Sequence, residues 1–166
     1  MDQKEPTLKT DDRFALQLRM LEKGAEELQR NIARMDEILF KIKAGSVTIW
    51  VALIGWAFTT KNTFIISFGW ILIIGFWLLE GFFRGLQERY LSKSFEVTKL
   101  LNDRKTLDDC FQSREFPPNI IYPLSFRESH FTELIMYARG LIAPAVSIFY
   151  LFLAFINYLI WMVYSR

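Results

Sequence analysis

Apolar residues recur at steps of four and three along the N-terminal part of the chain, and no proline interrupts them. They are Phe14, Leu18, Leu21, Ala25, Leu28, Ile32, Met35, Leu39 and Ile42. A helix with this spacing buries one narrow apolar stripe against another helix. The run leads directly into the apolar segment 44–59, so an unbroken helix through both would be about 70 Å long. The pattern predicts a helical bundle that stands on a membrane.

Part of this stripe is the predicted contact seam between subunits. The seam residues are Leu18, Leu21, Leu28, Ile32, Met35 and Leu39. The alternative is an ordinary amphipathic helix that folds back on its own chain, which needs no second copy. Gly24 lies beside the stripe and weakens it, because glycine is a poor helix former. The sequence leaves both interpretations open.

The composition indicates a membrane protein. Of the 166 residues, 52% are hydrophobic and 16% aromatic, and they gather in stretches without interior charge. The predicted spans are 44–59, 64–79 and 141–164, with a tight turn at 59–63 that makes the first two a hairpin. These two are short for a bilayer, where about 20 apolar residues are typical. The net charge of +2 is too small to indicate nucleic acid as the main partner.

The expected fold is an all-α membrane protein whose segments alternate in polarity. They are a flexible tail (1–12), a cytoplasmic heptad helix (13–43), a two-span membrane hairpin (44–79), a cytoplasmic helix (80–101), a cytoplasmic or interfacial loop with a short helix (102–140) and a third transmembrane helix (141–166). Lys and Arg are numerous before the first span and after the second, whereas the hairpin loop contains Lys61. The positive-inside rule therefore predicts a cytoplasmic N-terminus and a C-terminus outside.

The sequence contains no pattern typical of catalysis. Its one histidine, His130, and its one cysteine, Cys110, stand apart from any metal-ligand spacing. No glycine-rich phosphate loop follows a strand-like segment. We therefore expect a protein that is not an enzyme and uses no cofactor or metal.

Glu80 is the most informative ionisable residue. It ends the second span, where a carboxylate is costly unless it faces water or a partner. Arg84 and Glu88 follow one and two turns later on the same helix face. These three residues are candidates for a charged ring at a pore mouth, which would bias ion passage. The alternative is an interfacial salt bridge that anchors the end of the helix.

Two further features have a functional and a structural interpretation. Gly81 and Gly85 are four residues apart, which would permit close contact with another helix. Basic residues near the seam are candidate contacts for an anionic nucleotide or oligonucleotide, and a solvated helix face is the alternative. These basic residues are Arg30, Arg34, Lys41 and Lys43.

A motif at the end of the second span resembles a known group of proteins. The run Phe76-Trp77-Leu78-Leu79-Glu80-Gly81-Phe82-Phe83 is followed by Glu88-Arg89-Tyr90, and Arg34-Met35 and Lys43 precede the first span. Small bacterial inner-membrane proteins commonly carry Phe-Trp-x-Leu-Asp/Glu-x-aromatic-aromatic and then Glu-Arg-aromatic at this place. Over residues 30–95 the chain is similar to the SLATT-type effectors of bacterial antiphage systems, a group in which the Hailong system effectors are candidate relatives. Glu80 stands where Asp is more frequent.

The resemblance implies a homo-oligomeric membrane effector that conducts ions and depolarises the inner membrane on infection. Its expected partners are the lipid bilayer, further copies of the chain, and a nucleotide or oligonucleotide signal made by a partner nucleotidyltransferase. The signal would act through the cytoplasmic helices. Two alternatives are a non-conducting scaffold that recruits a soluble partner through its coiled coil, and a holin-like toxin without signal control.

Overall fold

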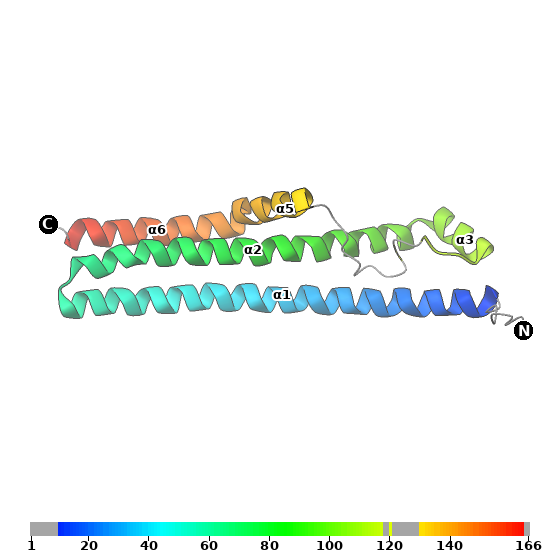
Figure 1. Ribbon diagram of the computed structural model, residues 1–166, viewed down its shortest axis with the longest axis horizontal. Helices are drawn as coiled ribbons and strands as arrows, with labels where there is room; N and C mark the ends of the chain where they lie inside the picture. Colours follow the sequence, from blue (N-terminus) through cyan, green and yellow to red (C-terminus); the bar gives the residue numbers. More distant parts are fainter. Residues whose placement is uncertain (1–9, 118–119, 121–129, 165–166) are drawn as a thin grey trace, which may run out of the picture. The chain divides into compact units, whose positions relative to one another are not determined.

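The computed structural model describes residues 10–117, 120 and 130–164, and these form helices and no strand (Figure 1). The helices are α1 (Thr10–Thr60), α2 (Thr63–Asn102), α3 (Arg104–Ser113), α5 (His130–Ile142) and α6 (Pro144–Tyr164). Among them α1, α2 and α6 are long and apolar enough to cross a membrane. The described residues thus confirm the expected all-α fold and contain three helices that could span a membrane.

A short turn joins α1 to α2 at the predicted place. Lys61 adopts a left-handed backbone conformation with φ 52°, which reverses the chain directly after α1. The side-chain Oδ1 of Asn62 accepts the backbone N–H of Phe64 at 3.0 Å, and this contact caps the start of α2. The hairpin therefore closes within two residues, Lys61 and Asn62.

The chain forms two compact units, and α1 and α2 contribute to both. The first unit comprises Met1–Ile32 and Tyr90–Arg127, and the second comprises Ala33–Arg89 and Glu128–Arg166. The three apolar helix segments belong to the second unit. The first unit contains the polar ends of α1 and α2, together with α3.

In the first unit, the apolar stripe of α1 packs against its own chain. The buried residues are Leu21, Leu28, Val97, Leu100, Cys110 and Phe116. Phe14 stacks on Phe116 with ring centroids 5.2 Å apart, and Gln17 accepts the backbone N–H of Phe116 at 3.3 Å. Helix α3 begins at the N-cap Asp103, whose side chain accepts the backbone N–H of Thr106. These contacts form a small core that requires no second copy of the chain.

The predicted subunit seam is therefore largely covered within the protomer. Leu21, Leu28 and Leu39 are buried, and Ile32 and Met35 are half-buried. Leu18 is 42% exposed. The contacts of the buried seam residues are those of the alternative interpretation, in which an amphipathic helix packs on its own chain. Leu18 keeps an exposed apolar surface for a further contact.

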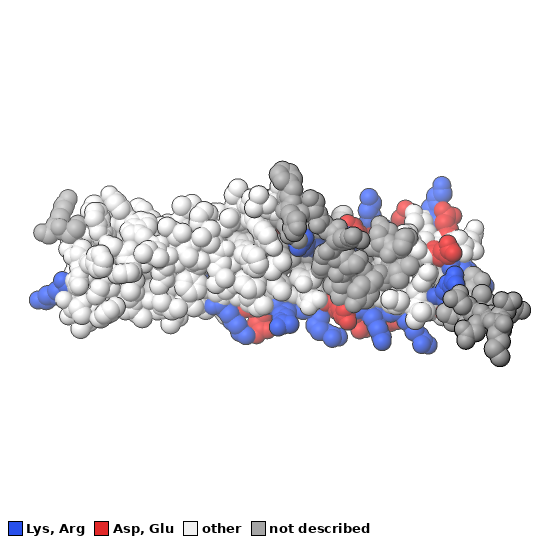
Figure 2. Space-filling view, viewed as in Figure 1, with Lys and Arg blue, Asp and Glu red and all other residues white. Residues whose placement is uncertain are grey.

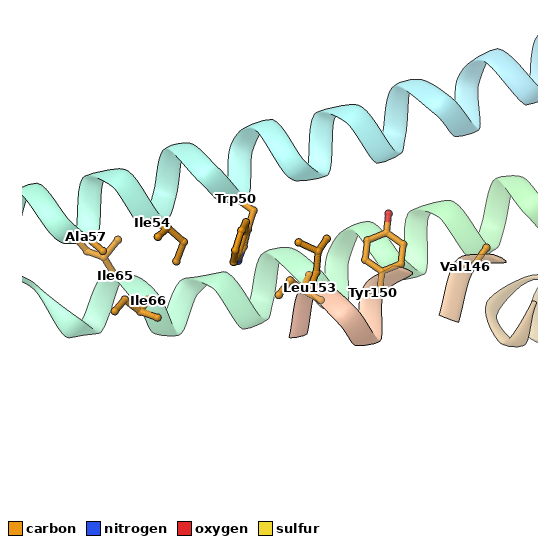
Figure 3. Packing of buried hydrophobic residues seen from close by; sticks show 9 residues of the cluster. Trp50, Ile54, Ala57, Ile65, Ile66, Val146, Tyr150 and Leu153 are labelled. Carbon is orange, nitrogen blue, oxygen red and sulfur yellow. The ribbon is translucent and has the colours of Figure 1, made fainter. Parts of the chain in front are cut away.

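The second unit is built from the apolar segments of α1, α2 and α6. Its core contains Trp50, Ile54, Ala57, Ile65, Ile66, Ile73, Val146, Tyr150 and Leu153. Figure 3 shows Trp50, Tyr150 and Leu153 pointing into the space between these helices. The surface over α6 carries no charged side chain, as the white region in Figure 2 shows. Along α6 the unit thus has an apolar exterior, as expected of a helix that could lie in a membrane.

The third apolar helix begins later than predicted. Helix α5 ends at Ile142 and α6 starts at Pro144, so the predicted span 141–164 is shortened to Pro144–Tyr164. The cause is Pro144, which lacks an N–H and disfavours a helical conformation of the residue before it. The predicted loop 102–140 contains α3 and α5, and its proline-rich part at 118–119 and 121–129 lies outside the described residues. The predicted tail 1–12 is helical from Thr10 onward.

Helix α5 packs against α2 through glycines. A Cβ at Gly140 would lie 2.7 Å from the backbone nitrogen of Gly85, and a Cβ at Gly81 would lie 2.7 Å from Cγ of Leu141. Backbone atoms cannot move aside cheaply, so only glycine fits at Gly140. The predicted close approach at Gly81 and Gly85 is thus found between helices of the same chain.

We predict that Gly140→Ala lowers the unfolding temperature of the detergent-solubilised protein, because α5 must move away from α2. The expected loss is about 1–3 kcal/mol, the usual cost of overpacking a tight contact. The control is Gly75→Ala, since no heavy atom of the described residues beyond the adjoining helix lies within 4 Å of a Cβ there. That variant should keep or raise the unfolding temperature, because alanine favours helix. Equal losses in both variants would contradict the close contact.

Candidate functional site

A buried carboxylate lies where α1, α2 and α6 meet. Glu80 is 1% exposed. Its Oε1 lies 3.2 Å from Nζ of Lys43 on α1, and its Oε2 accepts the hydroxyl of Tyr150 on α6 at 2.9 Å. Burial of a carboxylate costs several kcal/mol unless a charge and hydrogen bonds compensate. Both oxygens are therefore matched by groups from two other helices.

Lys43, on α1, also contacts both α2 and α6. Its Nζ also donates to the backbone carbonyl of Ala145 at 3.1 Å and lies 5.4 Å from the ring centroid of Phe149. Lys43 directly precedes the apolar segment of α1, and Glu80 directly follows that of α2. The Lys43–Glu80–Tyr150 contact thus stands at one end of the apolar bundle and fixes α6 to the hairpin.

A cavity of about 240 Å³ with both polar and apolar lining residues adjoins this contact. Asp36 and Arg84 contribute to its lining beside Lys43 and Glu80. Gln87 connects Asp36 and Arg84, since it accepts a hydrogen bond from Arg84 at 2.7 Å and donates one to Asp36 at 2.5 Å. The polar contacts therefore continue from the Lys43–Glu80–Tyr150 contact toward the charged parts of α1 and α2.

The predicted pore-mouth residues have different surroundings. Glu80 faces α1 and α6 of its own chain, Arg84 is half-buried and bonded to Gln87, and Glu88 is half-exposed. In the protomer, Glu80 has the contacts that the anchoring alternative predicts. In a charged ring formed by several subunits, the Glu80 carboxylate would have to face the pore and be more exposed than it is in the protomer.

The predicted anion-binding residues also differ from one another. Arg30 and Arg34 are exposed on α1. Lys41 pairs with Glu37 at 2.6 Å, and this contact lowers the pKa of the Glu37 carboxyl. The ammonium of Lys43 is held by Glu80 and Ala145, which gives it a structural role. Arg30 and Arg34 keep their guanidinium groups on the surface and remain the more accessible candidates.

The motif that carries the family resemblance forms the surface on which α5 and α6 pack. Trp77 donates its indole N–H to the carbonyl of Leu141 at 3.2 Å. Gly81 lies against Leu141, and the ring of Phe82 stacks on Tyr137 with centroids 4.9 Å apart. Glu80 adds the contacts to α1 and α6. The motif residues therefore hold the C-terminal helices on α2.

Sequence reasoning missed a second polar contact inside the bundle. Asn157 is 0% exposed, and its Oδ1 accepts the indole N–H of Trp50 at 3.1 Å. A side chain at Gly69 would collide with this amide, so glycine leaves it room. The available signal was the spacing in α6, where Val146, Tyr150, Leu153, Asn157, Ile160 and Tyr164 follow at steps of four and three. Polar groups recur there every seven residues.

The site offers ionic and hydrogen-bonding contacts between helices. Among the described residues, no group of three or more His, Cys, Asp or Glu side chains is placed to hold a metal ion. In this arrangement the position of α6 depends on the ion pair between the buried Glu80 carboxylate and the Lys43 ammonium. This makes it a candidate control point for helix rearrangement.

We predict that Lys43→Met destabilises the protein by about 3–5 kcal/mol, because it leaves the Glu80 carboxylate buried without a cation. The measurement is the thermal unfolding midpoint in detergent. The double variant Lys43→Met/Glu80→Leu should recover much of the loss, since it removes both charges from the apolar surroundings. Additive losses in the double variant would show that the two side chains are not coupled.

Comparisons of the chain with protein-family models, with curated proteins and with solved structures gave no match. The similarity to SLATT-type effectors therefore stays a prediction from the motif around Glu80. The function is inferred from the geometry of the second unit.

Proposed function

We propose that the chain is a membrane effector that assembles into a homo-oligomer and conducts ions across a bacterial inner membrane in antiphage defence. The Lys43–Glu80–Tyr150 contact is the observation that carries this proposal. An ionisable pair inside an apolar helix bundle is costly, and such residues commonly mark sites of transport or switching. In this proposal the contact holds α6 in a non-conducting arrangement.

The charge pair also provides a way to switch. A two-state arrangement responds to a ligand only through its different affinity for the two states. We propose that a nucleotide-type signal bound at the exposed Arg30 and Arg34 favours one arrangement of α1 and α2. These helices contribute directly to the Lys43–Glu80–Tyr150 contact, so their rearrangement would reach α6. The motif resemblance supports the same type of effector.

Assembly would use apolar surface that the protomer leaves open. The first unit has a groove of about 510 Å³ between α1 and α2. It is lined by Leu18, Leu21, Glu22, Ala25, Glu26, Gln29, Val97 and Leu101. Leu18 and Leu101 are 42% and 49% exposed. The proposed subunit seam therefore runs over this groove, where Leu18 and Leu101 are exposed, and not over the buried Leu28.

The same groove favours one alternative function. A non-conducting scaffold would use it to bind a helix of a soluble partner, because an amphipathic helix fits an apolar groove between two helices. A holin-like toxin would also conduct, but without a nucleotide signal. Ion flux distinguishes the scaffold from both conducting proteins, and the response to nucleotides distinguishes the two conducting proteins from each other.

The proposed function predicts ion flux in liposomes that contain the purified protein. The probes are K⁺ efflux alone, with ribonucleoside triphosphates, and with random DNA hexamers. Flux above that of protein-free liposomes, changed by one of the nucleotide probes, is the expected result. Flux that no nucleotide changes would indicate the toxin. Background flux under all three conditions would support the scaffold.

We predict that Leu18→Lys lowers the mass of the oligomer in detergent, because it places a charge in the proposed seam. The measurement is light scattering after size-exclusion chromatography, with helicity from circular dichroism. Leu16→Lys is the matched control, since Leu16 is 52% exposed on the same helix and does not line the groove. An unchanged mass for Leu18→Lys would exclude the groove as the seam.

A further inference from the structure

The polar side chains of the apolar bundle gather in its interior. Ser46 and Glu80 are 1% exposed, Tyr150 is 3% exposed and Asn157 is 0% exposed. They come from all three helices and occupy two levels along α6, since Tyr150 and Asn157 are seven residues apart. Such contacts can position helices in lipid, but apolar residues would pack there without the cost of burying polar groups.

The outward faces of the same helices are apolar. Ile71, Ile148 and Leu151 are each more than 65% exposed. The hydroxyls of Thr48 and Thr59 donate to carbonyls of their own helix, Ala44 and Gly55, at 2.8 and 2.9 Å. Subunits that met through these faces would therefore surround a space with few polar groups for an ion. The polar surface suited to an ion path is the one now buried between α6 and the hairpin.

The Asn157 amide gives a second, independent indication. The indole of Trp50 can only donate, so the oxygen of Asn157 must face it and the orientation of the amide is fixed. The amide nitrogen is then buried without a hydrogen-bond partner among the described residues. An unsatisfied N–H in an apolar interior is costly. The Asn157 amide nitrogen therefore lacks a hydrogen bond to the described residues in this arrangement, and exposure to water would supply one.

Helix α6 also has an attachment that is separate from that of α5. Glycine packing and the Trp77 indole hold the end of α5 on α2. Helix α6 is held by hydrogen bonds that Tyr150 and Tyr164 donate, the latter to the Phe58 carbonyl at 3.4 Å, and by one that Asn157 accepts from Trp50. Pro144 separates the two helices. Displacement of α6 while α5 stays in place would break the bond from the Ser147 hydroxyl to the Leu141 carbonyl of α5 at 2.9 Å, as well as the bonds to the hairpin.

We infer that α6 is the gating element and that its now-buried face, with Tyr150 and Asn157, lines the ion path together with Glu80. This inference rests on the proposed function. Displacement of α6 from α1 and α2 exposes the polar side chains to water between subunits. The Glu80 carboxylate then stands in the path and favours cations.

The test is a reversible disulfide between α6 and α2. Gly69→Cys/Asn157→Cys, in a Cys110→Ala background, places two thiols where the glycine now accommodates the amide. The control pair Gly81→Cys/Leu141→Cys joins α5 to α2 and leaves α6 free. Mass spectrometry verifies each bond before K⁺ efflux from liposomes is measured with and without dithiothreitol. We expect the α6 bond to reduce efflux to background, reduction to raise it to the level of the single Asn157→Cys variant, and the control bond to leave efflux unchanged.

Efflux that is equal with the α6 bond intact and reduced would overturn the gating role of α6 while the proposed function stands. Background efflux from the unmodified protein would overturn both. A single Asn157→Cys variant gives a readout that needs no disulfide. Its thiol should react with a membrane-impermeant maleimide under conducting conditions, whereas Ile148→Cys on the outward face should not. Equal labelling of the two positions would also overturn the inference.

Discussion

The burial of the Glu80 carboxylate is the constraint on which the arrangement of the second unit depends. A charge in this apolar setting requires a cation and hydrogen-bond donors at fixed places, and α1 and α6 supply them as Lys43 and Tyr150. Because each donor comes from a different helix, satisfying one carboxylate positions three helices at once. The remaining ammonium contacts, to Ala145 and Phe149, strengthen the attachment of the same α6.

The C-terminal helices are held by two kinds of contact. Helix α5 depends on shape, since Gly140 brings its backbone against that of Gly85. Helix α6 depends on matched polar groups in an apolar interior. Shape contacts need close packing and fail when side chains are enlarged, whereas polar contacts can be exchanged for contacts with water. The two helices therefore differ in how readily they can separate from α2, although Ala143 alone lies between them.

The helices were largely predictable from the sequence, and their partners were not. The uninterrupted spacing from Phe14 to Ile42 and the turn at Lys61 and Asn62 led to α1, α2 and their junction. Periodicity identifies a buried stripe but not what buries it. For Leu28 a second subunit and the same chain were both possible partners, and within the protomer Leu28 lies in one cluster with Val97 and Leu100. Pro144 was placed inside a helix that it actually begins.

The site was predictable only in part, for a related reason. The position of Glu80 at the end of a span indicated a costly charge, but its pairing with Lys43 joins residues 37 positions apart. Nothing local to either residue specifies that pair. The spacing in α6 marked the position of Asn157, but not its role, because its partners Trp50 and Gly69 lie on other helices.

The seven-residue interval between Tyr150, Asn157 and Tyr164 limits how α6 can travel. If α6 moved along its axis by one helical turn, apolar side chains would lie opposite Glu80 and Trp50. Both groups would then lose their hydrogen bonds to the Tyr150 hydroxyl and the Asn157 amide. The polar groups would coincide again only after two turns, roughly 10 Å. Translation of α6 along its axis therefore costs free energy at every intermediate position. A tilt of α6, or a rotation about its own axis without translation, costs less.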